Sequence, residues 1–474
     1  MKIPFLGGAY TGRSSNVSPE VCRNYFYERG KTGESLVSTP GGALFAALGA
    51  GPIRGAIPYN DNAFFVRGNT LFEVTSNGGF TSRGTLTTSA GFVSMAHNGT
   101  RTGAVQQLMI VDGTHGYIYN NVTQVLTAIA DVDMVNADAT VFVDGYFAFT
   151  ESSSDKWWIT ELYDGTAIDP LDFYTAEGSP DRGVMILADR RDIFVFQERT
   201  TERFWNTGDA NNTFQRYQGG FIEKGCAAPF TAKKFDNTVA WLGRDDEGQG
   251  QVVQIGDGNQ VQILTTPEVA YQISTYTTIT DAFAYVYQHE GHEFYVITFP
   301  TPGVTWAYDA LTQEWHTRSH TISGEPGRER YNCHVFAHGK HLFGDYENGN
   351  IYVLDSTLGT LNGVAIPRER RTMSLGDENR VALRAVQLDM DEGSDSEMWL
   401  SWSKDGGRTF SNEISRSAGG IGNYAHRLMW RRLGHARNWT FRLRTWTTKP
   451  HVLKGLIGMV RGEPSLQEQL LADQ

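Results

Sequence analysis

The sequence lacks any run of about eighteen apolar residues, the length that a membrane-spanning helix requires. Its first residues also lack the apolar core of about seven residues found in a secretory signal peptide. Cysteine is scarce, and the spacing of Cys22, Cys226 and Cys333 matches neither a disulfide framework nor a metal-ligand motif. These absences predict a soluble protein that is made in the cytoplasm and keeps its cysteines reduced.

Signatures of catalysis are missing too. There is no Gly-x-Ser-x-Gly elbow, no Walker loop and no dinucleotide fingerprint. The segment 289–292, His-Glu-Gly-His, is one residue too short for the zincin motif. We therefore expect no enzyme activity, no catalytic residues and no cofactor.

Glycine and aromatic residues are abundant instead, with 52 glycines and 12% aromatic residues in a chain of 474. Many Asn-Gly and Asp-Gly steps predict tight turns between short strands. This composition favours an all-β protein, and the length allows two or three domains.

A degenerate unit of an apolar strand, a Gly or Asp turn and a second apolar strand recurs from residue 53 onward. Its copies begin at Phe64, Leu108, Phe142, Ile193, Val239, Phe294 and Val335, at steps of 34 to 55 residues. Those steps scatter around the roughly 40–50 residues of one four-stranded propeller blade. The pattern predicts a β-propeller of six or seven blades, with unrelated hairpins in two sandwiches as the alternative.

Composition and periodicity divide the chain into four parts. Residues 1–52 read as an extended N-terminal arm that packs along another part of the chain, and residues 53–358 as the propeller. Residues 359–462 show two-residue alternation in successive hairpins, which predicts an appended β-sandwich-like domain. Residues 463–474 form a polar tail.

The stretch 414–462 contrasts with the rest of the chain, because it holds ten Lys or Arg and no acid. The chain carries a formal charge of −12, so the remainder carries −22. In 441–446 the arginines alternate with Phe441, Leu443 and Thr445, which places Arg442 and Arg444 together on one strand face. This basic segment can contact DNA, contact protein, or be a solvated face; we favour protein contact because the acidic remainder offers complementary surface. The interface candidates are Arg427, Trp430, Arg431, Arg432, Arg442, Arg444, Tyr25 and Tyr27.

Three further patterns have structural interpretations that we prefer to functional ones. The segment 403–410 matches the Asp-box of sialidase propellers and predicts a hairpin stabilised by Ser403, Asp405, Gly407, Thr409 and Phe410. Seven of twelve histidines fall between His289 and His341, where blade histidines are favoured over a metal site. The acidic turn 389–397 reads as solvated, or as a partner for the basic segment of a neighbouring subunit.

Several segments, taken in order, resemble the packaged-DNA stabilisation proteins that form the tail hub, or nozzle, of short-tailed bacteriophages. They are Ser94–His97, Trp157–Leu162, Glu177–Asp181, Thr201–Gly208 and Met429–Gly434. The resemblance implies a virion protein that assembles as a ring, by analogy a hexamer, below the portal and its adaptor. It also implies that the N-terminal arm packs with the C-terminal domain, 359–462, to form a platform against the adaptor. It implies further partners: a tail needle or plug, tailspike or fibre proteins, and double-stranded DNA that passes through the lumen without sequence recognition.

An acidic body suits a conduit for DNA, because it repels phosphate and prevents sticking. The basic segment is then expected to face the adaptor or a neighbouring subunit. A host-surface, glycan-binding propeller of the virion is the alternative function.

Overall fold

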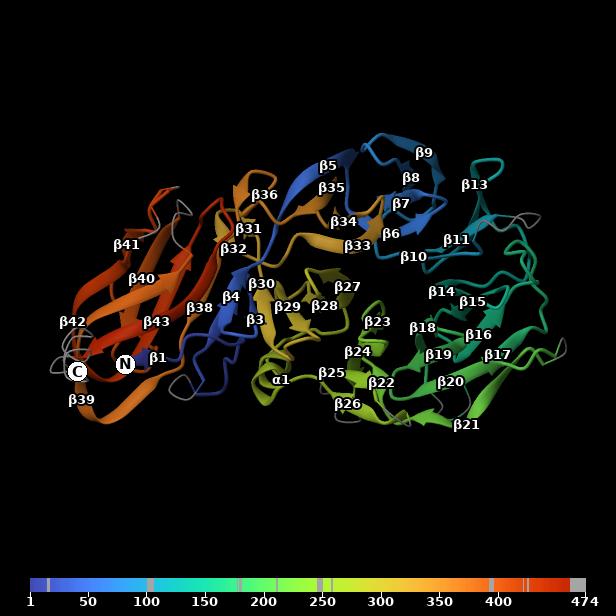
Figure 1. Ribbon diagram of the computed structural model, residues 1–474. Helices are drawn as coiled ribbons and strands as arrows, with labels where there is room; N and C mark the ends of the chain where they lie inside the picture. Colours follow the sequence, from blue (N-terminus) through green and yellow to red (C-terminus); the bar gives the residue numbers. More distant parts are fainter. Residues whose placement is uncertain are drawn as a thin grey trace.

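The computed structural model describes residues 1–14, 18–99, 106–176, 178, 181–209, 212–244, 250–256, 259–391, 396–420, 422–423 and 426–460. A ring of small sheets carries a two-sheet domain on one side, and both the first described strand, β1, and the last, β43, lie in that domain (Figure 1). Strands make up nearly all of the described regular structure, together with one helix, α1 (Pro267–Ser274). Within the described residues, no helix has both the length and the apolar character needed to cross a membrane.

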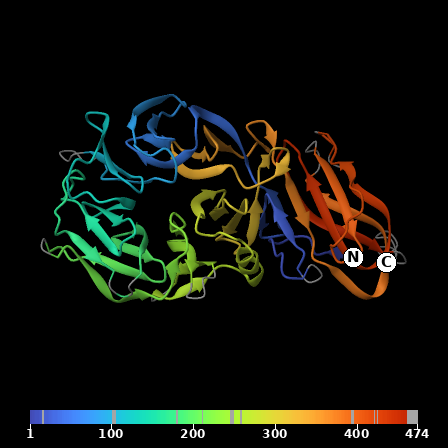
Figure 2. The same ribbon diagram turned by 180° about the vertical axis from the view of Figure 1, so that it is seen from behind.

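Seven blades of antiparallel strands follow one another around the ring, counted over the described residues (Figure 2). Blade one is β6 (Ile53–Tyr59), β7 (Asn62–Arg67), β8 (Thr70–Val74) and β9 (Phe80–Thr85). Blade two is β10 (Ser94–His97), β11 (Gln107–Val111), β12 (Gly116–Asn120) and β13 (Val125–Ala128). Blade three is β14 (Ala137–Val143), β15 (Tyr146–Glu151), β16 (Lys156–Ile159) and β17 (Phe173–Thr175). Blade four is β18 (Gly183–Asp189), β19 (Asp192–Gln197), β20 (Thr201–Asn206) and β21 (Phe214–Ile222).

Blade five has a divided first strand, because β22 (Gly225–Cys226) and β23 (Lys233–Phe235) both pair with β24 (Thr238–Arg244). It continues through β25 (Gly250–Ile255) and β26 (Val261–Ile263). Blade six is β27 (Phe283–His289), β28 (His292–Phe299), β29 (Val304–Asp309) and β30 (Trp315–Arg318). Blade seven contains β33 (Tyr331–Ala337), β34 (Lys340–Asp345) and β35 (Asn348–Asp355). Each repeat start lies in a different blade, so the predicted propeller is confirmed.

Apolar runs mark the blades because their middle strands are covered on both faces. Ala63, Phe64, Phe65 and Val66 of β7 are all fully buried between neighbouring blades. A strand covered on both sides reads as a continuous apolar run rather than as an alternating pattern. This explains why each repeat was visible as four to six consecutive apolar residues.

The ring is closed by a strand from near the N-terminus. β5 (Gly41–Ala50) pairs antiparallel with β35 as the outer strand of blade seven. Gly41 is required there, since a Cβ atom would lie 2.3 Å from the carbonyl oxygen of Thr360. The expectation of an arm over residues 1–52 is therefore wrong for residues 41–50, which belong to the propeller. Short hairpins at its margin are β31 (Thr321–Ile322) with β32 (Glu325–Pro326), and β36 (Thr360–Leu361) with β37 (Val364–Ala365).

The appended domain is a sandwich whose two sheets share one long strand, β42 (Leu428–Thr445). As far as Trp439, β42 pairs with β39 (Leu375–Met390), and from Thr440 onward it pairs with β40 (Glu397–Ser403) and β38 (Arg368–Arg371). The first sheet adds β43 (Val452–Val460), β1 (Lys2–Ile3), β4 (Glu34–Ser38) and β3 (Tyr25–Arg29), and the second adds β41 (Ile414–Ser417). The rest of the N-terminal segment thus packs with the C-terminal strands.

Propeller and sandwich form one continuous body. The short strand β2 (Val21–Arg23) runs parallel to β30 of blade six and antiparallel to β38 of the sandwich. A single apolar cluster contains Trp315 of blade six together with Leu400 and Leu443 of the sandwich. Each such buried side chain contributes about 1.5–3 kcal/mol, so the junction is stabilised as a core is.

Helix α1 lies between blades five and six. Thr266 caps its N-terminus, where the hydroxyl accepts from the amide of Val269 at 3.4 Å, and Pro267 begins the first turn. The Gln272 side chain donates to the carbonyl of Thr11 at 2.8 Å. The helix therefore holds the N-terminal segment against the propeller.

Candidate docking surface

Asn24 is the polar centre of the junction between the two domains. Its side-chain amide donates to the carbonyls of Ser319 at 2.7 Å and Pro367 at 2.6 Å, and its side-chain oxygen accepts from the Ser319 amide at 3.0 Å. It adopts a φ of 56°, a region in which asparagine is tolerated. One buried residue thus connects blade six, the N-terminal segment and the start of the sandwich.

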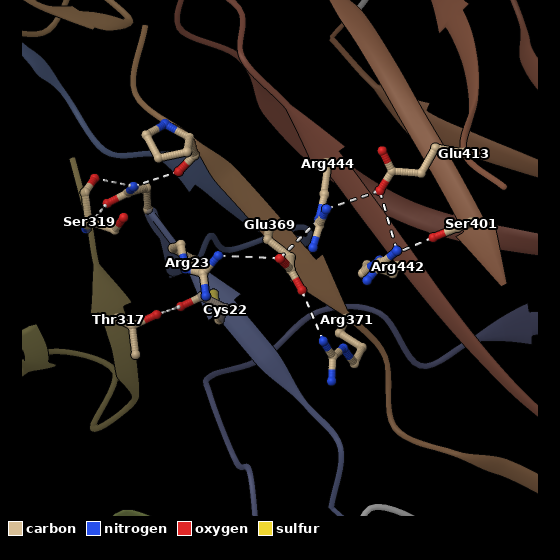
Figure 3. Close-up of polar contacts among 12 residues, drawn as sticks. Cys22, Arg23, Thr317, Ser319, Glu369, Arg371, Ser401, Glu413, Arg442 and Arg444 are labelled. Atoms are coloured by element: carbon tan, nitrogen blue, oxygen red, sulfur yellow. Dashed lines mark hydrogen bonds and ion pairs between the residues drawn. The ribbon is translucent and has the colours of Figure 1, made fainter. Parts of the chain in front are cut away.

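Beside it, the carboxylate of Glu369 binds three arginines from three strands. Arg23 lies at 3.3 Å, Arg371 at 3.2 Å and Arg444 at 3.1 Å (Figure 3). Burial by itself raises the pKa of Glu369, but the arginines, led by Arg23 and Arg444, outweigh it and hold the pKa below its usual range. Glu369 therefore stays ionised and holds β2, β38 and β42 together.

The neighbouring carboxylate of Glu413 takes up the remaining arginines of the strand face. It lies 3.4 Å from Arg442 and 3.3 Å from Arg444. The alternation predicted for 441–446 is present, since Phe441, Leu443 and Thr445 are buried on the opposite face. Arg442 and Arg444, however, are partly buried in ion pairs within the chain. The structure therefore gives them a role in joining the domains, in place of the exposed face that we expected.

Two fully buried arginines at the start of the sandwich were not singled out from the sequence. Arg368 donates to the carbonyl of Thr39 at 3.0 Å, and Arg370 donates to the carbonyl of Phe5 at 2.6 Å. Burial lowers the pKa of Arg368 to about 10. These two side chains fix the N-terminal segment by donating hydrogen bonds to its backbone carbonyls.

The two tyrosine candidates lie in the interior or at its edge. Tyr25 is fully buried and its hydroxyl donates to Nε2 of His451 at 2.8 Å, while Nδ1 of His451 lies 3.4 Å from the Lys449 carbonyl. Burial lowers the pKa of His451 to about 3. Tyr27 is half-buried against the core, and burial together with a hydrogen bond to Glu34 raises its pKa. Tyr25 is therefore a structural residue.

Trp430 is buried as well, and it protects a sheet edge. Its indole N–H donates to the carbonyl of Ile414 at 2.7 Å, and Arg416 donates to the carbonyl of Ser415 at 2.8 Å. Both carbonyls belong to β41, which ends the second sheet. Side-chain donors on an edge strand block pairing with another chain. Trp430 thus stabilises the fold and is not available for docking.

Exposed arginines gather instead on the first sheet, on β39 and β42. We call Arg380, Arg384, Arg431, Arg432 and Arg437 the arginine surface; all five are exposed, and none has an ion pair among the described side chains. The register places them together, because Val381 pairs with Ala436 and a bulge at Arg384 faces the Arg431–Gly434 segment. Arg427 is exposed just before β42, and Tyr424 and Arg461 of the basic stretch lie outside the described residues.

A hollow of about 570 Å³ opens on the second sheet, at the far end of β42. We call it the Trp446 pocket; it is lined by Glu397, Trp399, Glu413, Trp446, Thr447 and Thr448. Trp446 is 44% exposed and Trp399 half-buried. The pocket thus combines the indoles of Trp399 and Trp446 with the carboxylates of Glu397 and Glu413.

The Asp-box hairpin has the hydrogen bonds typical of that motif. Asp405 accepts from the Ser403 hydroxyl at 2.6 Å, the Thr409 hydroxyl at 2.6 Å and the Arg408 amide at 3.0 Å, and these bonds lower its pKa. Gly407 has a φ of 89°. Phe410 lies under Arg442, 4.3 Å from its guanidinium carbon. The hairpin therefore supports the arginine network.

The histidines of 289–341 are engaged in blades six and seven. His292 lies 2.7 Å from Asp309, His334 lies 3.0 Å from His341, and burial lowers the pKa of His320 and of His334 to about 3. Among the described residues, no group of three or more His, Cys, Asp or Glu could hold a metal ion. Glu392 and Asp395 of the acidic turn lie outside those residues.

The propeller axis is a cavity of about 790 Å³. The residues that line this cavity include Arg54, Lys233 and Lys234 and, among the described residues, no Asp or Glu. The acidic lining expected of a DNA conduit is therefore not the axis of a single propeller.

Two family models match this architecture domain by domain. The model "Bacteriophage P22 Gp10, beta-propeller" matches residues 1–359, and "Bacteriophage P22 Gp10, beta-sandwich" matches residues 367–458. The chain belongs to the bacteriophage P22 Gp10 family. The predicted resemblance to tail hub proteins and the predicted fold class, a propeller followed by a β-sandwich, are thereby confirmed.

A curated relative of this Gp10-family chain is the "Tail hub protein gp10" of Salmonella phage P22, 27% identical over 177 residues. The match covers 36% of this chain and 37% of the relative. Among solved structures, the β-propeller domain of Myceliophteria thermophila Cps50 (Swd1) matches with TM-score 0.42 at 9% identity, covering 66% of this chain and 99% of that domain. YCF48 bound to D1 peptide matches with TM-score 0.41 at 11% identity, covering 65% of this chain and 94% of that one.

Proposed function

We propose that this Gp10-family chain is a structural tail hub of a short-tailed bacteriophage. Copies of it form a ring below the portal and its adaptor, close the conduit after packaging, retain the genome, and conduct it during ejection. The observation that carries the proposal is the match of both Gp10 domains, in order, along the chain. No catalytic step is assigned to it.

The rigidity of the junction supports this role. Blade six and the sandwich share main-chain pairing through β2 and the ion pairs of Glu369, so force applied to one domain is transmitted to the other. A hub must keep its shape while DNA under pressure rests against it. The formal charge of −12 also suits a DNA conduit, since repulsion of phosphate prevents sticking.

The arginine surface suits a protein contact, with the adaptor or with a neighbouring subunit. Its guanidiniums are exposed and lack carboxylate partners among the described side chains, and an interface supplies such partners. The needle or plug and the tailspikes or fibres are proposed as further partners on the strength of the family alone.

The test uses heads packaged in the absence of this chain. We expect them to lose nuclease-protected DNA, and to retain it once the purified chain is added. The Arg431→Glu, Arg432→Glu double variant should fail to restore retention, whereas the Arg190→Glu, Arg191→Glu variant, which alters an exposed arginine pair on the propeller, should restore it. Heads that hold their DNA equally well without the chain would exclude the hub role.

A further inference from the structure

The chemistry of the Trp446 pocket fits a cation. Indole faces attract a guanidinium or ammonium through the ring quadrupole, and carboxylates complete its charge and hydrogen bonds. Trp399 and Trp446 have no ring or cation partner among the described residues, and Glu397 has no ion pair there. Glu413 binds Arg442 and Arg444 from one side and faces the pocket as well. The pocket thus has aromatic walls and a carboxylate that is not yet neutralised.

The planar guanidinium of arginine is the cation that suits such walls best, because it stacks on an aromatic ring and bonds a carboxylate through two N–H groups at once. The same chain displays five exposed guanidiniums on its arginine surface. We propose that the Trp446 pocket of one copy receives a guanidinium from the arginine surface of a second copy, with Arg431 and Arg432 as the inserting residues. The inference rests on the proposed ring and names the contact that forms it.

A contact within one chain is excluded by distance. Arg432 lies in the first third of β42 and Trp446 directly follows its last residue, so at about 3.3 Å per residue the chain between them spans roughly 45 Å before its bend is taken into account. An arginine side chain cannot cover that separation. The two surfaces also lie on different sheets of the sandwich. They can meet only between copies.

The contact has a consequence for symmetry. The pocket and the arginine surface are different patches, so each copy uses one patch toward each of two neighbours. A contact of this kind is heterologous and generates a ring when its rotation closes. Because both patches lie on the sandwich, this domain forms the continuous part of the ring and the propellers project from it.

Two variants of the full chain separate the two halves of the contact. The pocket variant carries Glu397→Arg and Trp446→Ala, and the surface variant carries Arg431→Glu and Arg432→Glu. Matched controls are Trp205→Ala, at a tryptophan 36% exposed on blade four, and the Arg190→Glu, Arg191→Glu pair. Near-ultraviolet circular dichroism and urea midpoints establish that each variant is folded.

Sedimentation velocity then measures assembly. We expect the wild-type chain and both controls to form the closed oligomer, and each contact variant to sediment as a monomer. An equimolar mixture of the two variants should give a one-to-one dimer and nothing larger, because one intact pocket and one intact arginine surface remain between them. A closed oligomer formed by either contact variant would overturn the assigned contact while leaving the ring in place. A wild-type chain that stays monomeric would overturn both the contact and the proposed ring.

Discussion

Glu369 and Arg444 form an ion pair of 3.1 Å between the strand that leaves the propeller and the strand that spans both sheets of the sandwich. Glu369 has 5% of its side chain exposed, so this pair is largely removed from water. Arg23 of the N-terminal segment binds the same carboxylate. The three parts of the chain therefore meet at one buried charge.

Replacing Glu369 by glutamine should destabilise the protein by about 3 kcal/mol. The change leaves partly buried arginines without their carboxylate, and breaking such a pair costs about 3–5 kcal/mol when both partners are buried. The three arginine side chains are 23–30% exposed, which places the value at the low end. Urea unfolding measures it. Asp391→Asn, which removes the exposed pair with Lys454, is the control and should change stability by less than about 1 kcal/mol.

Acid should destabilise the protein through His451. Burial lowers its folded-state pKa to about 3, whereas the unfolded chain takes up a proton near pH 6.5. Its contribution to stability is therefore present above about pH 6.5 and is lost as pH falls toward 3. His451→Gln keeps an acceptor for the Tyr25 hydroxyl and should reduce the fall in urea midpoint between pH 7.5 and pH 4.5. An identical fall in wild type and variant would refute this assignment.

Replacing Trp430 by phenylalanine should cost about 1–3 kcal/mol, because the carbonyl of Ile414 loses its donor. Arg431→Ala, at the next residue, should change stability by less than about 0.5 kcal/mol because its side chain is exposed. Equilibrium urea unfolding compares the two. Equal stability of both variants would contradict the edge-protecting role of Trp430.

Gly41→Ala should weaken closure of the ring. The added Cβ would lie 2.3 Å from the carbonyl oxygen of Thr360 and 2.7 Å from that of Leu358, so β5 must shift from blade seven. We expect a loss of about 2 kcal/mol or more and faster proteolytic cleavage near residue 41. Gly33→Ala is the matched control, since no atom lies within 4 Å of its added Cβ.

Much of the propeller could be predicted from the sequence, because each middle strand carries its own apolar run and turn. Closure by β5 could not, since it pairs with β35 some 300 residues away, and its Ala- and Gly-rich sequence resembles a loop. Local patterns report which strands form. They do not report which distant strand completes a sheet.

In the basic stretch 414–462, likewise, the sequence shows where charges lie but not which of them are paired in the fold. Alternation correctly placed Arg442 and Arg444 on one strand face, but Glu369 and Glu413, which bind them, lie outside that stretch or at its border. The sequence places Trp430 beside exposed arginines and therefore suggested an interface residue. Its hydrogen bond to the carbonyl of Ile414, which shows a structural role, forms only in the tertiary fold and cannot be read from the sequence. Net charge in a segment therefore indicates a basic region without showing which side chains stay free.

Cryo-electron microscopy of the tail vertex in phage particles that contain this chain tests the hub assignment most directly. We expect copies of the chain arranged as a closed ring around the DNA axis below the portal, with the sandwich domains touching one another and the propellers projecting from them. Density for the chain only at the side of the tail, in separate copies away from the axis, would contradict it and favour a host-surface binding protein.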